Sequence, residues 1–175
     1  MRAALFGAYA GSGAAFAHSA SWSNWSGGQT CQPVGRYDIG SEEELTSLLR
    51  NTLGPIRPVG SGHSFSPLVP TDGHLVVIDQ LNGILDSDSA NNQVTLGAGS
   101  RLGDLGAQLD AIGQGMINLP DIDRQTVAGA IATGTHGTGV TLKALSSFIT
   151  SLRLVTPNGN VMDINSSDED LLHAA

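Results

Sequence analysis

Two glycine-rich segments hold the residues of this sequence whose types and spacing could do chemistry. The first, residues 58–67, reads PVGSGHSFSP and follows a short apolar stretch. Glycines on both sides of Ser61 allow the backbone to approach a ligand closely, and successive amides in such a turn can form an anion-binding nest. His63 adds an imidazole, which is a nucleophile when neutral. The segment therefore indicates either a phosphate cradle or a tight turn without a ligand.

Neither of the two common nucleotide motifs is present in this first segment. Phe65 stands where a Rossmann fingerprint has its third glycine, and no long helix is expected to follow. The Gly-Lys-Ser/Thr ending of a P-loop is missing as well. Any binding of phosphate groups by this turn must therefore belong to another class of nucleotide site.

The second segment, residues 127–139, reads VAGAIATGTHGTG. Its glycines, threonines and histidine offer amides and hydroxyls with little bulk, as a wall against a flat cofactor and its phosphates requires. A helix start packed closely on a strand would account for Gly129, Ala130 and Ala132. That alternative leaves the stretch 133–136 unexplained, so the segment favours a binding wall.

Other candidate chemistry is weaker. Asp121 and Asp123 could act as paired carboxylates, but they follow Asn-Leu-Pro, and a solvated turn or an ion pair with Arg124 explains them better. No two of the five histidines have ligand spacing with a carboxylate, and one cysteine cannot build a thiolate site. No metal site is predicted. His136 fits a structural or cofactor-contacting role better than that of an acid or base.

Composition excludes further classes of protein. The 175 residues contain 16 Asp and Glu against 8 Lys and Arg, a formal net charge of −8. Nucleic-acid surfaces need clustered cations, so no nucleic-acid partner is predicted. No apolar run reaches the roughly 20 residues that span a bilayer.

The elements that must position the two segments can be predicted from caps and periodicity. A capping box of Ser41 with Glu44 starts a helix whose apolar face carries Leu45, Leu48, Leu49 and Leu53, and Gly54-Pro55 ends it. Ser100 caps a second helix, with Leu102, Leu105, Leu109 and Ile112 on one side, up to Gly113. Strands are expected at 56–59, 75–78 and 93–98, with a hairpin of 148–155 and 160–164.

The order of these elements predicts an α+β or α/β fold in two lobes, residues 30–100 and 100–175 approximately. A last helix opens at Ser166 but shows neither a glycine cap nor a basic last turn. The fold is therefore expected to be incomplete at its C-terminus.

Residues 1–20 are predicted to be an export signal rather than part of the fold. Arg2 precedes an uncharged stretch of small and apolar residues, and Ala15-Phe16-Ala17 offers a cleavage site after Ala17. A disordered tail and a first core helix are the alternatives, the latter disfavoured by three glycines. Export implies a periplasmic or membrane-associated protein; without it the protein is cytoplasmic.

The two segments together resemble a known family. VGSGHSFSP (59–67), paired with NLPDIDRQTVAGAIATGTHGTG (118–139), is similar to the FAD-binding (PCMH-type) domain of the vanillyl-alcohol-oxidase superfamily. The nearest branch is that of the aldonolactone and alditol oxidases, such as L-gulonolactone oxidase and D-arabinono-1,4-lactone oxidase. Asn24-Trp25-Ser26-Gly27 resembles the segment that opens these proteins. The resemblance covers residues 22–175, and it implies the two-lobed α+β FAD-binding fold of this superfamily.

The resemblance also implies roles for individual residues. His63 would carry a covalent bond from an imidazole nitrogen to the 8α-methyl carbon of the flavin. Asp121 lies where the alditol oxidases place a serine near flavin and substrate, which puts its substrate contact in doubt. The implied FAD-binding residues are Pro58, Val59, Gly60, Ser61, Gly62, His63, Ser64, Asp121, Thr126, Gly129, Ala130, Ile131, Ala132, Thr133, Gly134, Thr135, His136 and Gly137.

For the whole protein, the resemblance implies an FAD-dependent oxidoreductase acting on a CH–OH group. A sugar alcohol or aldonolactone would give a hydride to covalently held FAD, and dioxygen, a quinone or a cytochrome would reoxidise it. The catalytic residues would lie in a substrate (cap) domain absent from this chain, which alone is expected to be inactive. Alternatives are a dehydrogenase of another branch, a noncatalytic nucleotide-binding module and a secreted structural domain.

Overall fold

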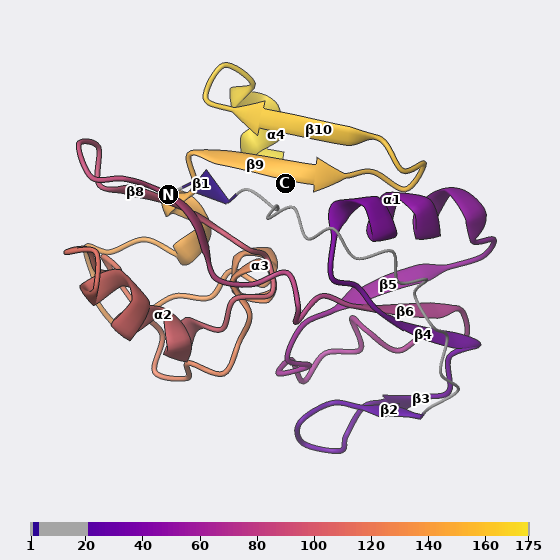
Figure 1. The fold of residues 1–175 in the computed structure, drawn as a ribbon. Coiled ribbons are helices and arrows are strands. Elements are labelled where there is room, and N and C mark those ends of the chain that lie inside the picture. The colour runs from indigo at the N-terminus through magenta and orange to yellow at the C-terminus, as the bar shows by residue number, and fades with distance from the viewer. Residues whose placement is uncertain (1, 4–20, 175) are drawn as a thin grey trace.

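The structure, a computed structural model, describes residues 2–3 and 21–174, which form two α+β lobes side by side (Figure 1). The first lobe contains residues 21–83, and the second contains residues 84–174 together with residues 2–3. Residues 1–20 were predicted to lie outside the fold, but Arg2–Ala3 form a strand of the second sheet; the predicted cleavage site after Ala17 lies outside the described residues. The predicted α+β class is confirmed.

The first lobe is built on a parallel sheet with the strand order β4-β6-β5. These strands are β4 (Gly35–Asp38), β5 (Ile56–Val59) and β6 (His74–Val77). Because side chains alternate along a strand, Leu75 and Val77 of β6 pack on one face, while Val76 packs on the other beneath helix α1 (Glu42–Asn51). A short hairpin of β2 (Trp22–Ser23) and β3 (Thr30–Cys31) joins the Leu75 face, where Trp22 is buried.

Helix α1 follows the predicted caps with two differences. The Ser41 hydroxyl accepts from the Glu44 amide at 3.2 Å, as expected. The Glu44 carboxylate accepts from the Gly40 amide at 2.9 Å, one residue before the amide that a capping box uses. Leu53 was predicted on the apolar face, but it is 92% exposed because the chain turns to extended backbone at Thr52.

The second lobe has a five-stranded sheet with the order β10-β9-β1-β8-β7. The hairpin of β9 (Ser151–Val155) and β10 (Val161–Asn165) forms as predicted, although β9 begins three residues later than expected and Phe148 belongs to a 3-10 turn, η1 (Leu145–Phe148). β1 (Arg2–Ala3) lies between β8 (Gln93–Leu96) and β9, parallel to both, and β7 (Ile84–Asp88) forms the edge.

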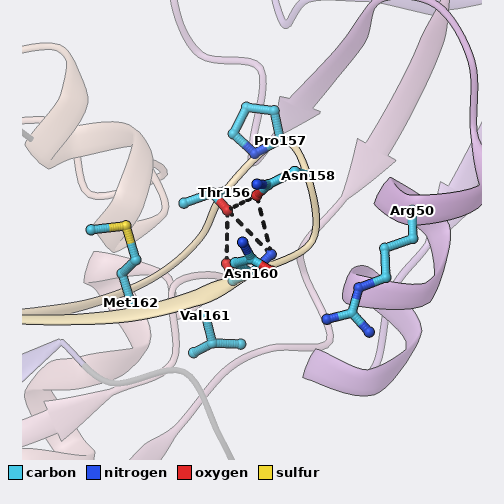
Figure 2. Close-up of a pocket in the computed structure, with 7 residues that line it drawn as sticks. All are labelled: Arg50, Thr156, Pro157, Asn158, Asn160, Val161 and Met162. Atoms are coloured by element: carbon cyan, nitrogen blue, oxygen red, sulfur yellow. Dashed lines mark hydrogen bonds between the residues drawn. The ribbon is translucent and has the colours of Figure 1, made fainter.

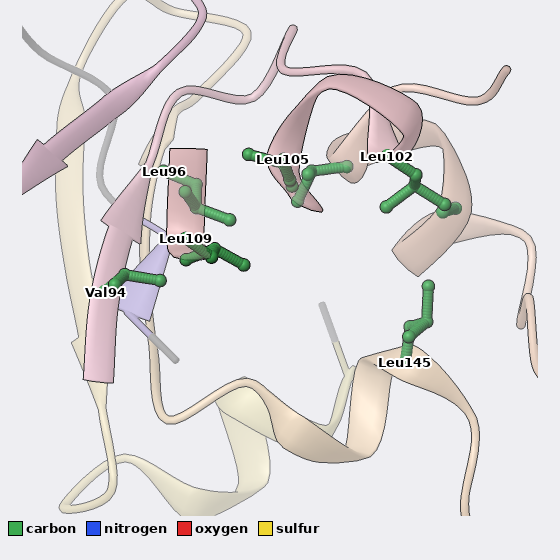
Figure 3. Close-up of a cluster of buried hydrophobic side chains, with 8 residues drawn as sticks. Val94, Leu96, Leu102, Leu105, Leu109 and Leu145 are labelled. Carbon is green, nitrogen blue, oxygen red and sulfur yellow. The ribbon is translucent and has the colours of Figure 1, made fainter. Parts of the chain in front are cut away.

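The lobe boundary predicted near residue 100 is wrong. β7 and β8 belong to the second sheet, and Val94 and Leu96 of β8 are buried there against the helices of the second lobe. Figure 3 shows this core, in which Leu102, Leu105 and Leu109 of the following helix cluster with Val94, Leu96 and Leu145. The boundary therefore falls between β6 and β7.

Two details of the helices in the second lobe also differ from expectation. Arg101, not Ser100, is the N-cap of α2 (Leu102–Asp110), because the Ser100 hydroxyl accepts from the Gly83 amide at 2.8 Å instead. Ile112 lies beyond the end of α2 and is 39% exposed. The last helix, α4 (Glu169–Ala174), begins three residues after Ser166.

Two arginines connect the lobes. Arg50 of α1 donates to the Gly159 carbonyl at 2.7 Å, and Arg153 of β9 donates to the Glu42 carboxylate at 2.9 Å. The hydrogen bond to Glu42 raises the pKa of Arg153, with the charges of Glu42 and Asp163 adding to it and desolvation opposing it. No helix in the described part of the chain is long and apolar enough to cross a membrane.

Candidate functional site

The two glycine-rich segments meet at one cavity of about 270 Å³ between the lobes. The first segment reaches it at the end of β5, and the second reaches it at the start of α3 (Val127–Ala132). The lining residues are Arg57, Pro58, Val59, Gly60, Ser61, Gly62, His63, Ser64, Leu68, Val69, Gln125, Thr126, Gly129, Ala132 and Thr133. Residues about 70 positions apart in the sequence thus share one wall.

Gly60 and Thr126 show how closely the segments approach. A methyl group at Gly60 would lie 2.8 Å from the Thr126 Cγ2 atom and overlap its hydroxyl, so only glycine fits without a shift. Thr126 is itself buried, at 1% exposed, and its hydroxyl accepts from the Gly129 amide at 3.2 Å as the N-cap of α3. Thr126 therefore has two roles: it contacts Gly60 of the first segment, and it caps the start of α3.

The first segment offers backbone donors. Within the described part of the chain, the amides of residues 61–64 donate no hydrogen bond. The carbonyls of this loop are used: Gly62 O accepts from Trp25 N at 3.1 Å, and Ser64 O accepts from Asn24 Nδ2 at 2.9 Å. A trans peptide points its C=O and the following N–H in opposite directions. The His63 amide therefore points away from the hairpin that holds the Gly62 carbonyl, and successive free amides of this kind suit an anionic oxygen.

His63 is half-buried and lines the cavity. Its imidazole stacks on the indole of Trp25, with ring centroids 4.6 Å apart and an interplanar angle of 2°. Trp25 in turn meets Phe65 edge to face at 5.1 Å. The His63 loop therefore carries a nucleophilic side chain in a fixed plane at the cavity wall.

Some predicted residues do not line the cavity. Ala130 is fully buried in the core of the second lobe, and Ile131 packs against that core. Asp121 is exposed, and Asp123 is paired with Arg124 at 3.6 Å. The loop of Gly134, Thr135, His136 and Gly137 lies outside the lining, because the chain leaves the cavity after Thr133.

Four lining residues were missed by the sequence interpretation: Arg57, Leu68, Val69 and Gln125. Arg57 directly precedes the first segment, and Gln125 directly precedes the N-cap of α3, so adjacency to the motifs was the available signal. Gln125 donates from Nε2 to the Thr135 hydroxyl at 2.7 Å. This hydrogen bond links the cavity lining to the loop of residues 134–137, which lies outside the lining. No such signal marks Leu68 or Val69.

A second, larger cavity of about 760 Å³ lies at the tip of the β9–β10 hairpin (Figure 2). Arg50, Thr156, Asn158, Asn160 and neighbouring residues line it, and the polar side chains bond within the turn itself, as between Thr156 Oγ1 and the Asn160 carbonyl at 2.9 Å. None of the predicted site residues lines it. No group of three or more His, Cys, Asp or Glu that could hold a metal occurs among the described residues.

A family model matches most of this chain. Residues 39–165 match the family model of an FAD binding domain, so this chain belongs to the FAD-binding domain family. The resemblance inferred from the two glycine-rich segments is confirmed, and FAD is the cofactor of this domain.

Curated relatives have names from lactone metabolism. The chain is 41% identical over 153 residues to an L-gulono-1,4-lactone dehydrogenase of Mycobacterium tuberculosis, covering 86% of this chain and 36% of the relative. It is 35% identical over 156 residues to the L-gulonolactone oxidase of Mus musculus, covering 87% and 36%. It is also 35% identical over 153 residues to the D-arabinono-1,4-lactone oxidase of Eremothecium gossypii, covering 83% of this chain and 29% of that relative. The chain thus spans about a third of these relatives.

Solved structures support the fold. Cholesterol oxidase from Brevibacterium sterolicum superposes with a TM-score of 0.76 at 21% identity, over 93% of this chain and 35% of that one. At this identity the likeness concerns the fold alone.

The residues at the first cavity fit FAD. The free amides of residues 61–64 suit a pyrophosphate, and Gly129 and Ala132 add little bulk to the opposite wall, which suits a flat molecule. When bound, FAD supplies a ring system that accepts a hydride. The protein contributes the groove, the donors and the imidazole of His63.

Proposed function

We propose that this chain is the cofactor-binding part of a flavin-dependent oxidoreductase that oxidises a sugar-derived alcohol or an aldono-1,4-lactone. The lactone names of the relatives support the substrate class. The single observation that carries the cofactor assignment is the shared cavity of residues 57–64 and 125–133. The chain covers about a third of these relatives, so residues elsewhere in the whole protein would orient and deprotonate the alcohol.

Within this part, each segment has a separate task. The loop at residues 61–64 holds the negatively charged pyrophosphate with its amides, and the start of α3 closes the groove through the Gly60–Thr126 contact. Substrate selection does not belong to these residues.

We further propose that His63 is bonded to the cofactor. An imidazole nitrogen of His63 would bond to the 8α-methyl carbon in place of one methyl C–H bond and the imidazole N–H bond. The flavin would take up the two protons and two electrons that this releases, and dioxygen would reoxidise it. The position of His63 in the cavity wall supports this attachment.

The decisive experiment is acid precipitation of the whole protein. Yellow colour should stay with the precipitate of the wild type and leave the precipitate of His63→Ala, while His63→Ala still binds FAD before precipitation. Addition of an aldonolactone to the wild type should bleach the flavin absorbance. A colourless wild type that binds no FAD would contradict the cofactor assignment, and an unbleached spectrum with every aldonolactone and sugar alcohol would contradict the substrate class.

The electron acceptor divides two versions of this proposal. Dioxygen would make the protein an oxidase, whereas a quinone or cytochrome would make it a dehydrogenase, and the relatives carry both kinds of name. Turnover with lactone should be measured as oxygen uptake and, separately, as reduction of cytochrome c or a soluble quinone. The faster reaction identifies the acceptor class.

We also propose export, on the sequence of residues 1–20, with a cleavage that would remove β1 (Arg2–Ala3) from the second sheet. Mass spectrometry of the mature protein from the producing cell should find its N-terminus at residue 18. An intact Met1 in the mature protein would contradict export and indicate a cytoplasmic location.

A further inference from the structure

The β2–β3 hairpin holds the loop that carries His63. Besides the bonds to the Gly62 and Ser64 carbonyls, Gln29 Nε2 donates to the Phe65 carbonyl at 3.2 Å. Trp22 lies against Gly62, where an added methyl group would come within 3.0 Å of its ring. The hairpin precedes residues 39–165, the part that matches the FAD-binding family model. Its contacts therefore need an explanation that the family match does not supply.

Trp25 is the hairpin residue in contact with the His63 side chain. The two rings are stacked within 2° of parallel, although Trp25 is 53% exposed and buries little area in the core. A tryptophan exposed to this degree gains only part of the free energy that full burial of its ring would give. The stack on His63 and the edge contact with Phe65 are the interactions that its ring does make.

We propose that Trp25 is a positioning residue for the attachment of FAD to His63. The flat face of the indole fixes the plane of the imidazole, so that a ring nitrogen on the imidazole edge stays directed along the cavity wall. This inference rests on the covalent attachment proposed above.

The physical reason is orientation. His63 follows Gly62, which has a φ of +61°, and precedes an exposed stretch, and the stack on Trp25 holds its ring plane on one side. Bond formation requires the nitrogen at close range and in line with the methyl carbon, and loss of such orientation slows a reaction between bound groups. Stacked rings contribute enough free energy to change the oriented population by up to about tenfold.

The test measures attachment separately from binding. Apoprotein from riboflavin-starved cells is mixed with FAD, and acid-stable flavin is followed with time. Trp25→Leu should slow its formation about tenfold, whereas Trp25→Phe, which keeps a stacking face, should restore most of the rate. The matched control is Phe65→Leu, which removes a neighbouring exposed ring that does not stack on His63, and it should leave the rate unchanged. FAD affinity before attachment should stay within about twofold in all three variants.

A second measurement needs no attachment. In the wild-type apoprotein, the ring protons of His63 should resonate upfield under the ring current of Trp25, and Trp25→Leu should move them downfield. Should Trp25→Leu fail to fold, Trp25→Met serves as the second variant without a ring, and melting temperature shows which variants are folded.

The outcomes separate the two proposals. A wild type that binds FAD but never forms acid-stable flavin overturns the attachment at His63, and with it the role of Trp25. Attachment in the wild type at the same rate as in folded Trp25→Leu or Trp25→Met overturns the role of Trp25 alone. So does a Trp25→Phe variant as slow as Trp25→Leu, because stacking would then not be the cause.

Discussion

The two glycine-rich segments have similar compositions but line the cavity in different ways. Residues 58–64 line it continuously and present free amides together with His63. Of the second segment, only Gly129, Ala132 and Thr133 line it, next to the N-cap Thr126, while Ala130 is a core residue and the stretch 134–137 lies outside. The helical period explains the difference: in α3, successive residues face different neighbours, whereas a loop can direct several consecutive amides to one ligand.

This comparison separates glycines that are required by contact from glycines that are not. Gly60 is required because the other segment occupies the space of a side chain. Gly134, with a φ of +64°, has nothing within 4 Å of its Cβ position, so backbone conformation rather than contact accounts for it. Four substitutions test this reading, in order of decreasing expected effect.

Gly60→Val should have the largest effect. Its branched side chain cannot occupy the volume of Thr126, so the segments must separate, and overpacking of this kind costs about 1–3 kcal/mol in stability. FAD affinity, measured by fluorescence quenching, should fall at least 100-fold. The matched control is Gly106→Ala in α2, where the space is open and an alanine should stabilise the exposed helix by about 0.5–1 kcal/mol. Wild-type affinity in Gly60→Val would contradict the close approach.

Thr126→Val should have an intermediate effect. The substitution keeps the shape but removes the hydroxyl that accepts from the Gly129 amide, and loss of an N-cap costs about 0.5–2 kcal/mol. The free energy of unfolding from urea denaturation should fall by this amount, with a smaller loss of FAD affinity than in Gly60→Val. Thr126→Ser keeps the acceptor and should recover most of the cap. Equal stability of the valine and serine variants would show that the cap is unimportant.

Glu42→Gln should have a smaller effect, on the contact between the lobes. It removes the charge that Arg153 pairs with, and because the Arg153 side chain is 32% exposed the loss should be about 0.2–1 kcal/mol, smaller still in high salt. Because the pKa of Arg153 is raised above its ordinary value, the cation is present throughout the usual pH range, and only a rise in pH through the raised pKa would remove it. Salt titration of the melting temperature therefore tests the pair better than pH does.

His136→Ala should have the smallest effect. His136 is exposed and its ring nitrogen Nδ1 contacts only the carbonyl of the next residue, Gly137, at 2.8 Å. FAD affinity and melting temperature should both stay at the wild-type values, in contrast to the loss of acid-stable flavin in His63→Ala. A tenfold loss of affinity in His136→Ala would extend the binding site into the second half of the segment.

Local signals in the sequence predicted most of the fold. Ser41 and Glu44 marked the start of α1, and the two neighbouring strand patterns at 148–155 and 160–164 marked the β9–β10 hairpin, because caps and hairpins depend on residues close in sequence. The lobe boundary failed because the pairing of β8 with β1 is non-local. The prediction of Ser100 as an N-cap was wrong because its hydroxyl accepts from the amide of Gly83, 17 residues away in sequence.

The candidate site was predictable in its first segment and only partly in its second. A run of glycines around His63 shows directly that the backbone is accessible. Whether Ala130 or Ala132 faces the cavity depends on how α3 packs, and only the buried neighbours of Ala130 decide it. The stack of Trp25 on His63 joins two segments 38 positions apart, and no spacing rule predicts it.

The central claim is that FAD binds between the two segments and not in the larger cavity at the hairpin tip. Hydrogen–deuterium exchange of the whole protein carrying His63→Ala, with and without FAD, tests it most directly. FAD should slow exchange in peptides covering residues 58–64 and 126–133 and leave residues 156–162 unchanged. Protection of residues 156–162, with both glycine-rich segments exchanging as before, would contradict the claim.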